Sequence, residues 1–275
     1  MGDVAAGRTF TLTPKTRGLS SLRELFEYRS LWWTLTLSEL RTRYKGSVLG
    51  FLWTFLNPLL TLIVYSVVFS TVMRIRMAHY SAFLFIGILA WNMFASAVQA
   101  SAGVIIRQAG LVKKIYFPRQ VLPLSVVGGS VLNFVFSLAI LLPFLILEGY
   151  QPDVQWLWLV PITLCEAVMA AGFALLVSAL NVYIRDLEHM LSILLMIWFY
   201  ITPIVYAPYM IPHNWIQLFK LNPVSGCIIA FQSVLYFHSP LHWKLEAYTV
   251  AFAVFVFVVG WSTFERLSRR FAEEV

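Results

Sequence analysis

The chain has 275 residues, of which 60% are hydrophobic and only 12% are charged. A soluble domain of this size cannot bury that much apolar surface, so the composition excludes an ordinary soluble protein and indicates several membrane crossings. The net charge of +7 indicates topology and attraction to anionic lipid head groups, and it is no sign of nucleic-acid binding.

Six apolar stretches are long enough to cross the roughly 30 Å hydrocarbon core, which takes about 20 helical residues. Helices are expected because the runs are too long and too uniform for barrel strands, and because backbone groups in lipid must be satisfied within the segment. The predicted fold is therefore an all-α polytopic membrane protein, with residues 47–265 as a six-span transmembrane domain. The predicted spans are Phe51–Met73, Ala82–Ala102, Val121–Leu147, Trp156–Leu180, Met190–Ala207 and Ala247–Phe264.

The distribution of lysine and arginine predicts the orientation of these spans. Residues 1–50 hold eight such residues and the loop after the second span holds four, whereas the loops on the opposite side hold four in all. By the positive-inside rule, both termini are expected in the cytoplasm, and the chain in the cytoplasmic membrane. Residues 1–20 are then a mobile cytoplasmic tail, and residues 266–275 form a second one.

The region between the fifth and sixth spans is ambiguous. Two short apolar pieces, Trp215–Leu221 and Val224–Phe237, are separated by Asn222-Pro223, and a proline disfavours helix at the residue before it. The second piece is too short to span, so external re-entrant helices are expected here. A seventh span would also place the C-terminal arginines outside.

Residues 21–46 have a different character, because apolar residues recur there at helical spacing among charged ones. We expect an amphipathic helix in the inner membrane interface, since Trp32 and Trp33 suit the head-group layer. A soluble helix packed on a partner is the alternative. At its end, Arg41, Arg43 and Lys45 are placed to contact the phosphates of a lipid diphosphate, although positive-inside anchoring explains them equally.

The two loops on the cytoplasmic side have two readings each. The first, residues 107–119, is basic and partly apolar, so it either docks in a groove on a soluble partner or is an ordinary basic loop at the membrane surface. The second, residues 181–188, holds an arginine beside an aspartate, which is either a local ion pair or a docking point. The candidate residues are Arg107, Leu111, Lys113, Lys114, Ile115, Phe117, Arg119, Arg185 and Asp186.

An ordered set of short motifs carries a family resemblance over roughly residues 20–265. Glu39–Trp53, Asn57–Leu59, Val112–Arg119, Asn181–Asp186, Thr202-Pro203 and Leu221–Pro223 occur in the order found in ABC-transporter permeases that export polysaccharides and polyol-phosphate polymers. The sequence most resembles those that translocate wall teichoic acid, and O-antigen and capsule permeases are close relatives. It departs from the pattern at Gln232, where an arginine is frequent.

The resemblance implies a homodimer that binds two copies of a separate P-loop ATPase subunit. The partner would bind ATP and Mg²⁺, because this chain contains no G-x-x-x-x-G-K-[ST] motif and is expected to hold no cofactor and no catalytic residues. The two cytoplasmic loops would be coupling helices. The cargo would be teichoic acid on undecaprenyl diphosphate, with O-antigen or capsular polysaccharide as the alternative.

A polymer path needs surfaces that hold sugar rings or glycerol phosphates without gripping them, and aromatic faces suit this purpose. An aromatic cluster precedes Thr202-Pro203, where the proline would open the helix. Interface anchoring or ordinary packing is the alternative for each ring. The candidate path residues are Asn57, Tyr65, Trp198, Phe199, Tyr200 and Thr202.

Two other functional classes compete with an exporter. A membrane enzyme acting on lipid-linked intermediates needs converging acids, bases or metal ligands, and the candidates here are scattered. A passive channel or a secondary transporter is the other class, and a secondary transporter would show coupling-ion residues at the midplane, where only Glu166 is found. His238 and His242 have helical spacing, but Pro240 lies between them and no metal site is expected.

Overall fold

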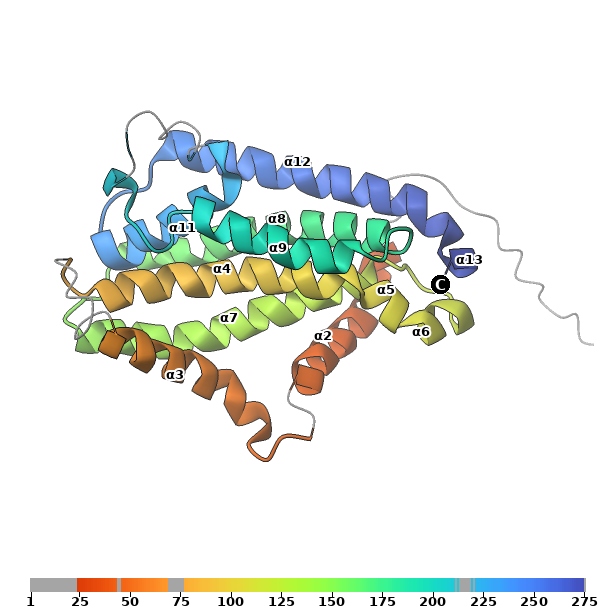
Figure 1. Cartoon of the computed structure of the whole chain (residues 1–275), viewed down its shortest axis with the longest axis horizontal. Helices are drawn as coiled ribbons and strands as arrows, with labels where there is room; N and C mark the ends of the chain where they lie inside the picture. The colour runs from red at the N-terminus through yellow and green to blue at the C-terminus, as the bar shows by residue number, and fades with distance from the viewer. Residues whose placement is uncertain are drawn as a thin grey trace, which may run out of the picture.

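The computed structural model describes residues 24–43, 46–68, 77–210, 212, 219 and 221–274. All regular structure in these ranges is helical. Four long helices run side by side along the long axis of the molecule (Figure 1). They are α4 (Tyr80–Ala102), α7 (Val121–Leu147), α8 (Leu159–Asn181) and α12 (Trp243–Leu267).

These four helices are long and apolar enough to cross a membrane, so the described part of the chain has at least four candidate spans. They confirm four of the predicted spans, and Val121–Leu147 agrees at both ends. A 3-10 turn (Val154–Trp158) directly precedes α8 and lengthens it at its start, and Asp153 is the N-cap of this turn. The protein is therefore a multi-pass membrane protein.

The other two predicted spans correspond to shorter described helices, and only the end of the fifth can be compared with its prediction. Helices α3 (Trp53–Val67) and α9 (Leu187–Ile201) have 15 residues each, which is about 22 Å of helix against a hydrocarbon core of about 30 Å. The prediction that the fifth span reaches Ala207 is wrong, because Thr202 is extended as expected for a residue before proline. The first span was predicted to end at residue 73, outside the described residues, and the six-span count stays a prediction.

Asn222-Pro223 begins a new helix, as the sequence indicated. Helix α11 (Pro223–Gln232) has its proline in the first turn, where a missing N–H costs nothing, and the Asn222 side chain accepts a hydrogen bond from the Val224 amide. A π-helical turn, η5 (Ser233–Phe237), extends it. Nearly all of α11 is buried among α4, α8 and α12. Most of Trp215–Leu221 lies outside the described residues, and a re-entrant path stays a prediction.

The N-terminal amphipathic segment forms α2 (Arg29–Arg43), which lies across α7. Trp32 Nε1 donates to the Leu124 carbonyl oxygen at 3.1 Å, and Thr36 and Leu40 are buried. A Cβ on Gly128 of α7 would lie 2.9 Å from Thr36 Oγ1, so this glycine permits the close crossing. The packed face is thus centred on Trp32 and Thr36, whereas Trp33 is exposed.

Two hydrophobic clusters hold the bundle together. The larger surrounds α4 and α11, and the smaller lies near the C-terminus, where Phe117, Phe264 and Phe271 are buried. Helices α8 and α12 form the most extensive contact between two described helices, with Gly172 at the crossing. This arrangement fixes the loops at one end and leaves the faces of α3, α4 and α9 open to form a groove.

Candidate functional site

The end of the bundle near the C-terminus gathers three segments that are far apart in sequence (Figure 1). The first is the short pair α5 (Val104–Arg107) and α6 (Ala109–Lys114). The second is the turn 182–186 between α8 and α9, and the third is α13 (Phe271–Glu274). We call these three segments, with residues 115–120, the basic end.

Polar contacts join the two loops of the basic end. Arg107 Nη1 lies 3.6 Å from Glu188 Oε1, with both side chains about half exposed, and Arg107 also donates to the Ala100 carbonyl. Gln99 Nε2 donates to the Glu188 carbonyl at 3.0 Å, and the Glu188 amide donates to buried Asn181 Oδ1 at 3.1 Å. The two loops are therefore held as one unit, and Arg107 is a brace within it.

The C-terminal segment fastens the same unit from the other side. Phe271 is fully buried and packs edge-on against Phe264 at 5.4 Å between ring centroids. The Arg119 guanidinium lies 5.9 Å from the Phe271 ring and donates to the Ser268 carbonyl. Tyr183 Oη donates to the Leu267 carbonyl at 2.9 Å. Burial lowers the pKa of Arg119, and Tyr116 opposes that shift.

The side chains that remain free at the basic end form a mixed cationic and apolar surface. Ile115, Tyr116 and Ile184 are 57%, 71% and 55% exposed, which is high for large apolar side chains. Among the predicted coupling residues, Phe117 is buried within the protein, so it is not free to seat in a partner's groove, and Leu111 is half-buried. The exposed ones are Lys113, Lys114, Ile115, Arg185 and Asp186.

Tyr116 was not singled out from the sequence, although an aromatic residue just after two lysines is a signal for a surface contact. Its hydroxyl lies 3.5 Å from Glu24 Oε1, and this carboxylate raises the pKa of Tyr116. The start of the N-terminal helical segment therefore also reaches the basic end.

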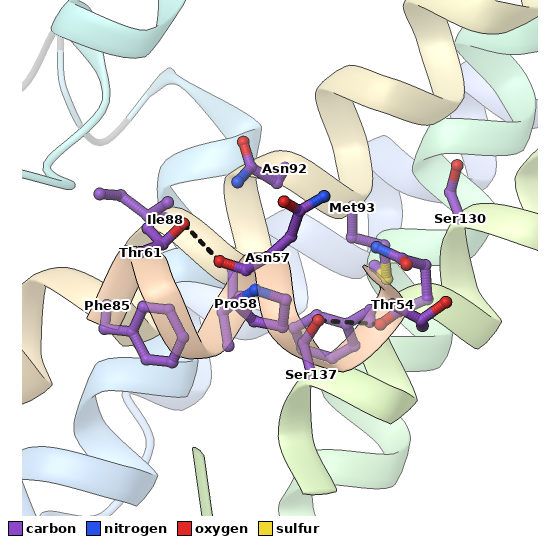
Figure 2. A pocket seen from close by; sticks show the side chains of 13 residues that line it. Thr54, Asn57, Pro58, Thr61, Phe85, Ile88, Asn92, Met93, Ser130 and Ser137 are labelled. Atoms are coloured by element: carbon purple, nitrogen blue, oxygen red, sulfur yellow. Dashed lines mark hydrogen bonds between the residues drawn. The ribbon is translucent and has the colours of Figure 1, made fainter. Parts of the chain in front are cut away.

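A second feature is a polar pocket of about 210 Å³ between α3, α4 and α7 (Figure 2). Figure 2 shows the amide side chains of Asn57 and Asn92 on the same side of this pocket. Thr54 Oγ1 and Asn133 Oδ1 are buried without a hydrogen-bond partner among the described residues. The polar lining residues are Thr54, Asn57, Thr61, Asn92, Ser130, Asn133 and Ser137.

A second pocket of about 440 Å³ continues this one across α4 to α9. The two pockets share Thr61, Ile88 and Asn92, so we treat them as one polar groove along α3, α4, α7 and α9. The second part adds the hydroxyl of Ser192 and three aromatic rings. These rings belong to Trp91, Phe199 and Tyr200.

Asn92 is the exposed side chain that α4 contributes to the polar groove. Every other residue of α4 is buried or half-buried, so the central helix shows one exposed position, and an amide occupies it. Asn92 was not among the predicted path residues, although a lone asparagine inside a 23-residue apolar helix is a recognisable signal. A polar group facing hydrocarbon is costly, which indicates that water, cargo or protein covers this surface.

The predicted path residues divide between the groove and the interior. Asn57, Phe199 and Tyr200 line the groove. Thr202 is fully buried, and Trp198 packs against Phe94 and Phe173 at 5.4 Å. The side chain of Tyr65 lies outside the described residues, as do those of Arg43 and Lys45, whereas Arg41 is exposed on α2.

Trp198 and Thr202 belong to a buried hydrogen-bond network that joins α9 to α11. Trp198 Nε1 donates to Asn222 Oδ1 at 2.9 Å, and Asn222 Nδ2 donates to Thr202 Oγ1 at 2.9 Å. Nearby, buried Gln232 Nε2 donates to the Pro203 carbonyl at 3.3 Å. Gln232, which stands where the family resemblance led us to expect an arginine, thus stabilises the turn after α9.

Glu166 in α8 lies apart from the polar groove. Its side chain is fully buried, and both carboxyl oxygens lack a hydrogen-bond partner within the described part of the chain. It lines neither part of the groove. The structure therefore places this carboxyl in the interior of the bundle, outside the polar groove.

A sequence profile of the family described as ABC-2 type transporter matches residues 30–236. The chain belongs to this family. The match runs from α2 to η5 and so includes both loops of the basic end and the whole polar groove.

Individual ABC-2 relatives agree with this assignment over most of their lengths. The chain is 36% identical over 262 residues to the O-antigen export system permease protein RfbA of Myxococcus xanthus, covering 92% of this chain and 98% of that one. It is 35% identical over 240 residues to the protein of the same name from Klebsiella pneumoniae, covering 87% and 92%. A polysialic acid transport protein, KpsM of Escherichia coli, is 24% identical over 197 residues, covering 69% and 75%.

These relatives favour O-antigen or capsular polysaccharide, the alternative cargo, over teichoic acid. The names of the relatives describe O-antigen export and polysialic acid transport, both polysaccharides. Teichoic acid, which the sequence motifs favoured, gains no support from them. The named relatives of this ABC-2 chain are accordingly polysaccharide exporters and transporters.

Proposed function

We propose that this chain is the membrane-conducting subunit of an ATP-driven exporter, and that its cargo is a lipid-linked polysaccharide that moves along the polar groove. The observation that carries the proposal is the position of Asn92, an exposed amide on the otherwise covered central helix. Uncharged amides and hydroxyls beside aromatic rings offer a glycan weak, replaceable contacts, which suit a moving polymer better than fixed charges do.

A second copy of the chain is the proposed cover for the groove. The exposed faces of α3 and α9 border it, and Asn57, Asn92 and Ser192 are exposed there. Facing lipid, these groups would lose their hydrogen bonds to water. Two chains placed groove to groove would enclose a polar path lined from both sides, and this is the homodimer that the motifs implied.

The basic end is the proposed docking surface for the ATPase subunit, which supplies the bound ATP and Mg²⁺. Its exposed Ile115 and Tyr116 offer apolar contacts, and Lys113 and Lys114 offer charge. Because Arg107, Asn181 and Glu188 join the two loops, a push on either loop would move α4 and α9 together. Those two helices border the polar groove, so a movement of the docked ATPase subunit would be transmitted to the groove.

The proposed orientation places the basic end in the cytoplasm, where a lipid diphosphate is made. Arg41 is exposed near the end of α2 and would meet the diphosphate at the inner surface through charge-assisted hydrogen bonds. The glycan would then enter the groove from that side and leave at the end where α3 and α4 are joined.

The test compares export by Asn92→Leu with that of a matched control, Ser262→Leu, in the cells that make the polymer. Ser262 is also an exposed polar residue on a long helix, but it lies outside the groove. We expect Asn92→Leu to lower surface polysaccharide at least about tenfold, equivalent to about 1.4 kcal/mol of barrier, while lipid-linked glycan accumulates inside. The control should export normally.

Normal export by Asn92→Leu at equal protein level would contradict the groove as the path. Chemical analysis of the accumulated lipid identifies the cargo in the same experiment. Sugars without glycerol phosphate or ribitol phosphate support a polysaccharide, whereas a polyol-phosphate polymer would restore teichoic acid.

A further inference from the structure

An apolar groove separate from the polar one lies beneath α2. It has a volume of about 630 Å³, within the range of ligand sites, and it is bounded by α2, α7 and α8. Its walls include Trp33 from α2, Leu132 from α7, and Leu164 and Ala167 from α8. The proposed function makes no use of this groove.

The two grooves lie on different faces of α7. The polar groove uses Ser130, Asn133 and Ser137, whereas the groove beneath α2 uses Leu124, Val127, Gly128, Val131 and Leu132. Within the second set no side chain carries a polar group. The polymer path and this groove therefore suit different kinds of molecule, and this one suits a hydrocarbon chain.

The length of the groove matches one leaflet of a membrane. From Leu124 to Leu132 the helix rises about 12 Å, at 1.5 Å per residue, and half of a hydrocarbon core is about 15 Å. Leu164 on α8 is exposed, so the groove opens sideways toward lipid. An acyl chain of the leaflet that contacts α2 can enter without crossing the protein.

The first turns of the N-terminal helical segment form one end of the groove, and the cationic side chain of Arg29 lies at this end. Arg29 lines the groove and is exposed, with its guanidinium 4.9 Å from the Phe26 ring. Among the described residues no carboxylate forms an ion pair with Arg29. Trp33, exposed beside it, is a typical head-group anchor. A guanidinium with no carboxylate partner among the described residues, placed above an apolar slot, is complementary to a phosphate that carries an acyl chain.

We propose that this groove binds one anionic phospholipid, with an acyl chain between α2, α7 and α8 and its phosphate on Arg29. The lipid would fill the space that the crossing of α2 over Gly128 leaves open. It would thereby hold α2 against the bundle next to Trp32, which also lines the groove and donates to the Leu124 carbonyl.

The experiment measures lipid retention by native mass spectrometry of the full-length chain in mild detergent, with dioleoyl phosphatidylglycerol added and phosphatidylethanolamine as competitor. Leu164→Trp fills the groove from an exposed position, so it should not impair folding, and Arg29→Gln removes the charge. The matched controls are Val258→Trp, an exposed apolar position on α12, and Arg269→Gln, an exposed arginine just before α13.

We expect one tightly held phosphatidylglycerol in the parent chain and both controls. Retention of phosphatidylglycerol should fall about tenfold in each of the two test variants. Leu164→Trp blocks the apolar binding site of the acyl chain, and Arg29→Gln removes one charge-assisted contact to the phosphate. Unchanged retention in Leu164→Trp, or equal retention of phosphatidylethanolamine, would overturn the proposal. Displacement of phosphatidylglycerol by a polyprenyl diphosphate would overturn it in favour of a cargo-lipid site, whatever the outcome for the polar groove.

Discussion

The crossing of α8 and α12 is the most stringent packing contact in the bundle. A Cβ added to Gly172 would lie 2.6 Å from the Phe257 amide nitrogen, 2.6 Å from the Val256 carbonyl carbon and 2.8 Å from the Phe257 Cα. All three atoms belong to the main chain, so no side-chain rotation can relieve the overlap. Ordinary contacts lie at about 3.5 Å or more, so Gly172→Ala must separate the two helices by about 1 Å.

The expected cost follows from these distances. Overpacking costs about 1–3 kcal/mol, and overlap with three main-chain atoms of α12 places this case near 3 kcal/mol. Alanine recovers about 1 kcal/mol of helix propensity, which leaves a net loss of about 2 kcal/mol. For a chain of this size that loss lowers the midpoint of thermal unfolding by about 4–8 °C.

The assay heats the detergent-solubilised protein in steps and measures the surviving monodisperse fraction by size-exclusion chromatography with tryptophan detection. Gly110→Ala is the matched control, because a Cβ there meets nothing within 4 Å. We expect its midpoint to be unchanged or higher. A midpoint for Gly172→Ala equal to that of Gly110→Ala would refute the close approach of α8 and α12.

Three further predictions concern single side chains. Phe271→Ala should release the C-terminal segment, since it removes a fully buried ring worth about 3–5 kcal/mol. Limited trypsin digestion should then cleave faster after Arg269 and Arg270. An unchanged cleavage rate would contradict the role of Phe271 in holding the C-terminal segment on the bundle. Asn222→Ala should lower the midpoint of thermal unfolding by several degrees. It leaves the Trp198 indole N–H without its acceptor and removes the N-cap of α11, at a cost of about 2–4 kcal/mol. An unshifted midpoint would count against the hydrogen-bond network between α9 and α11. Glu166→Met should raise the midpoint, because it replaces a buried carboxyl without a partner in the described structure by an apolar chain of similar length; a lower midpoint would reveal a stabilising contact.

The helices were predictable where length and apolar content alone decide the outcome. Val121–Leu147 agreed at both ends, and Asn222-Pro223 marked the start of α11 because a proline suits the first turn of a helix. The end of the fifth span was missed, although Pro203 gave the signal, since hydropathy continues past the point where the backbone turns extended. Local chemistry outweighed composition there.

The faces of the helices were less predictable than the helices themselves. Trp198 and Tyr200 are close in sequence and share one aromatic cluster, yet Trp198 is bound into the interior by Asn222 while Tyr200 lines the groove. Which face of α4 remains open depends on the placement of α3, α7 and α9, so the exposure of Asn92 follows from tertiary packing. Periodicity within one helix cannot supply that information.

The basic end shows the same division. The sequence located both loops correctly as charged, compact segments, but Arg107 and Arg119 proved to be bound within the protein, by Glu188 and by Ser268. Their partners lie 81 and 149 residues away, beyond the reach of any local pattern. Lys113 and Lys114 remain exposed and are the charges available to a partner.

The most direct test of the exporter account is the composition of the complex that the full-length chain forms in its native membranes. We would crosslink gently, purify the tagged chain in mild detergent and identify what accompanies it, for the parent, for Lys113→Glu with Lys114→Glu, and for the control Lys244→Glu at the opposite end of the bundle. The account predicts a P-loop ATPase in equal amount with the parent and the control, and its loss from the double variant. A reproducible preparation of the parent chain without an ATPase would contradict it.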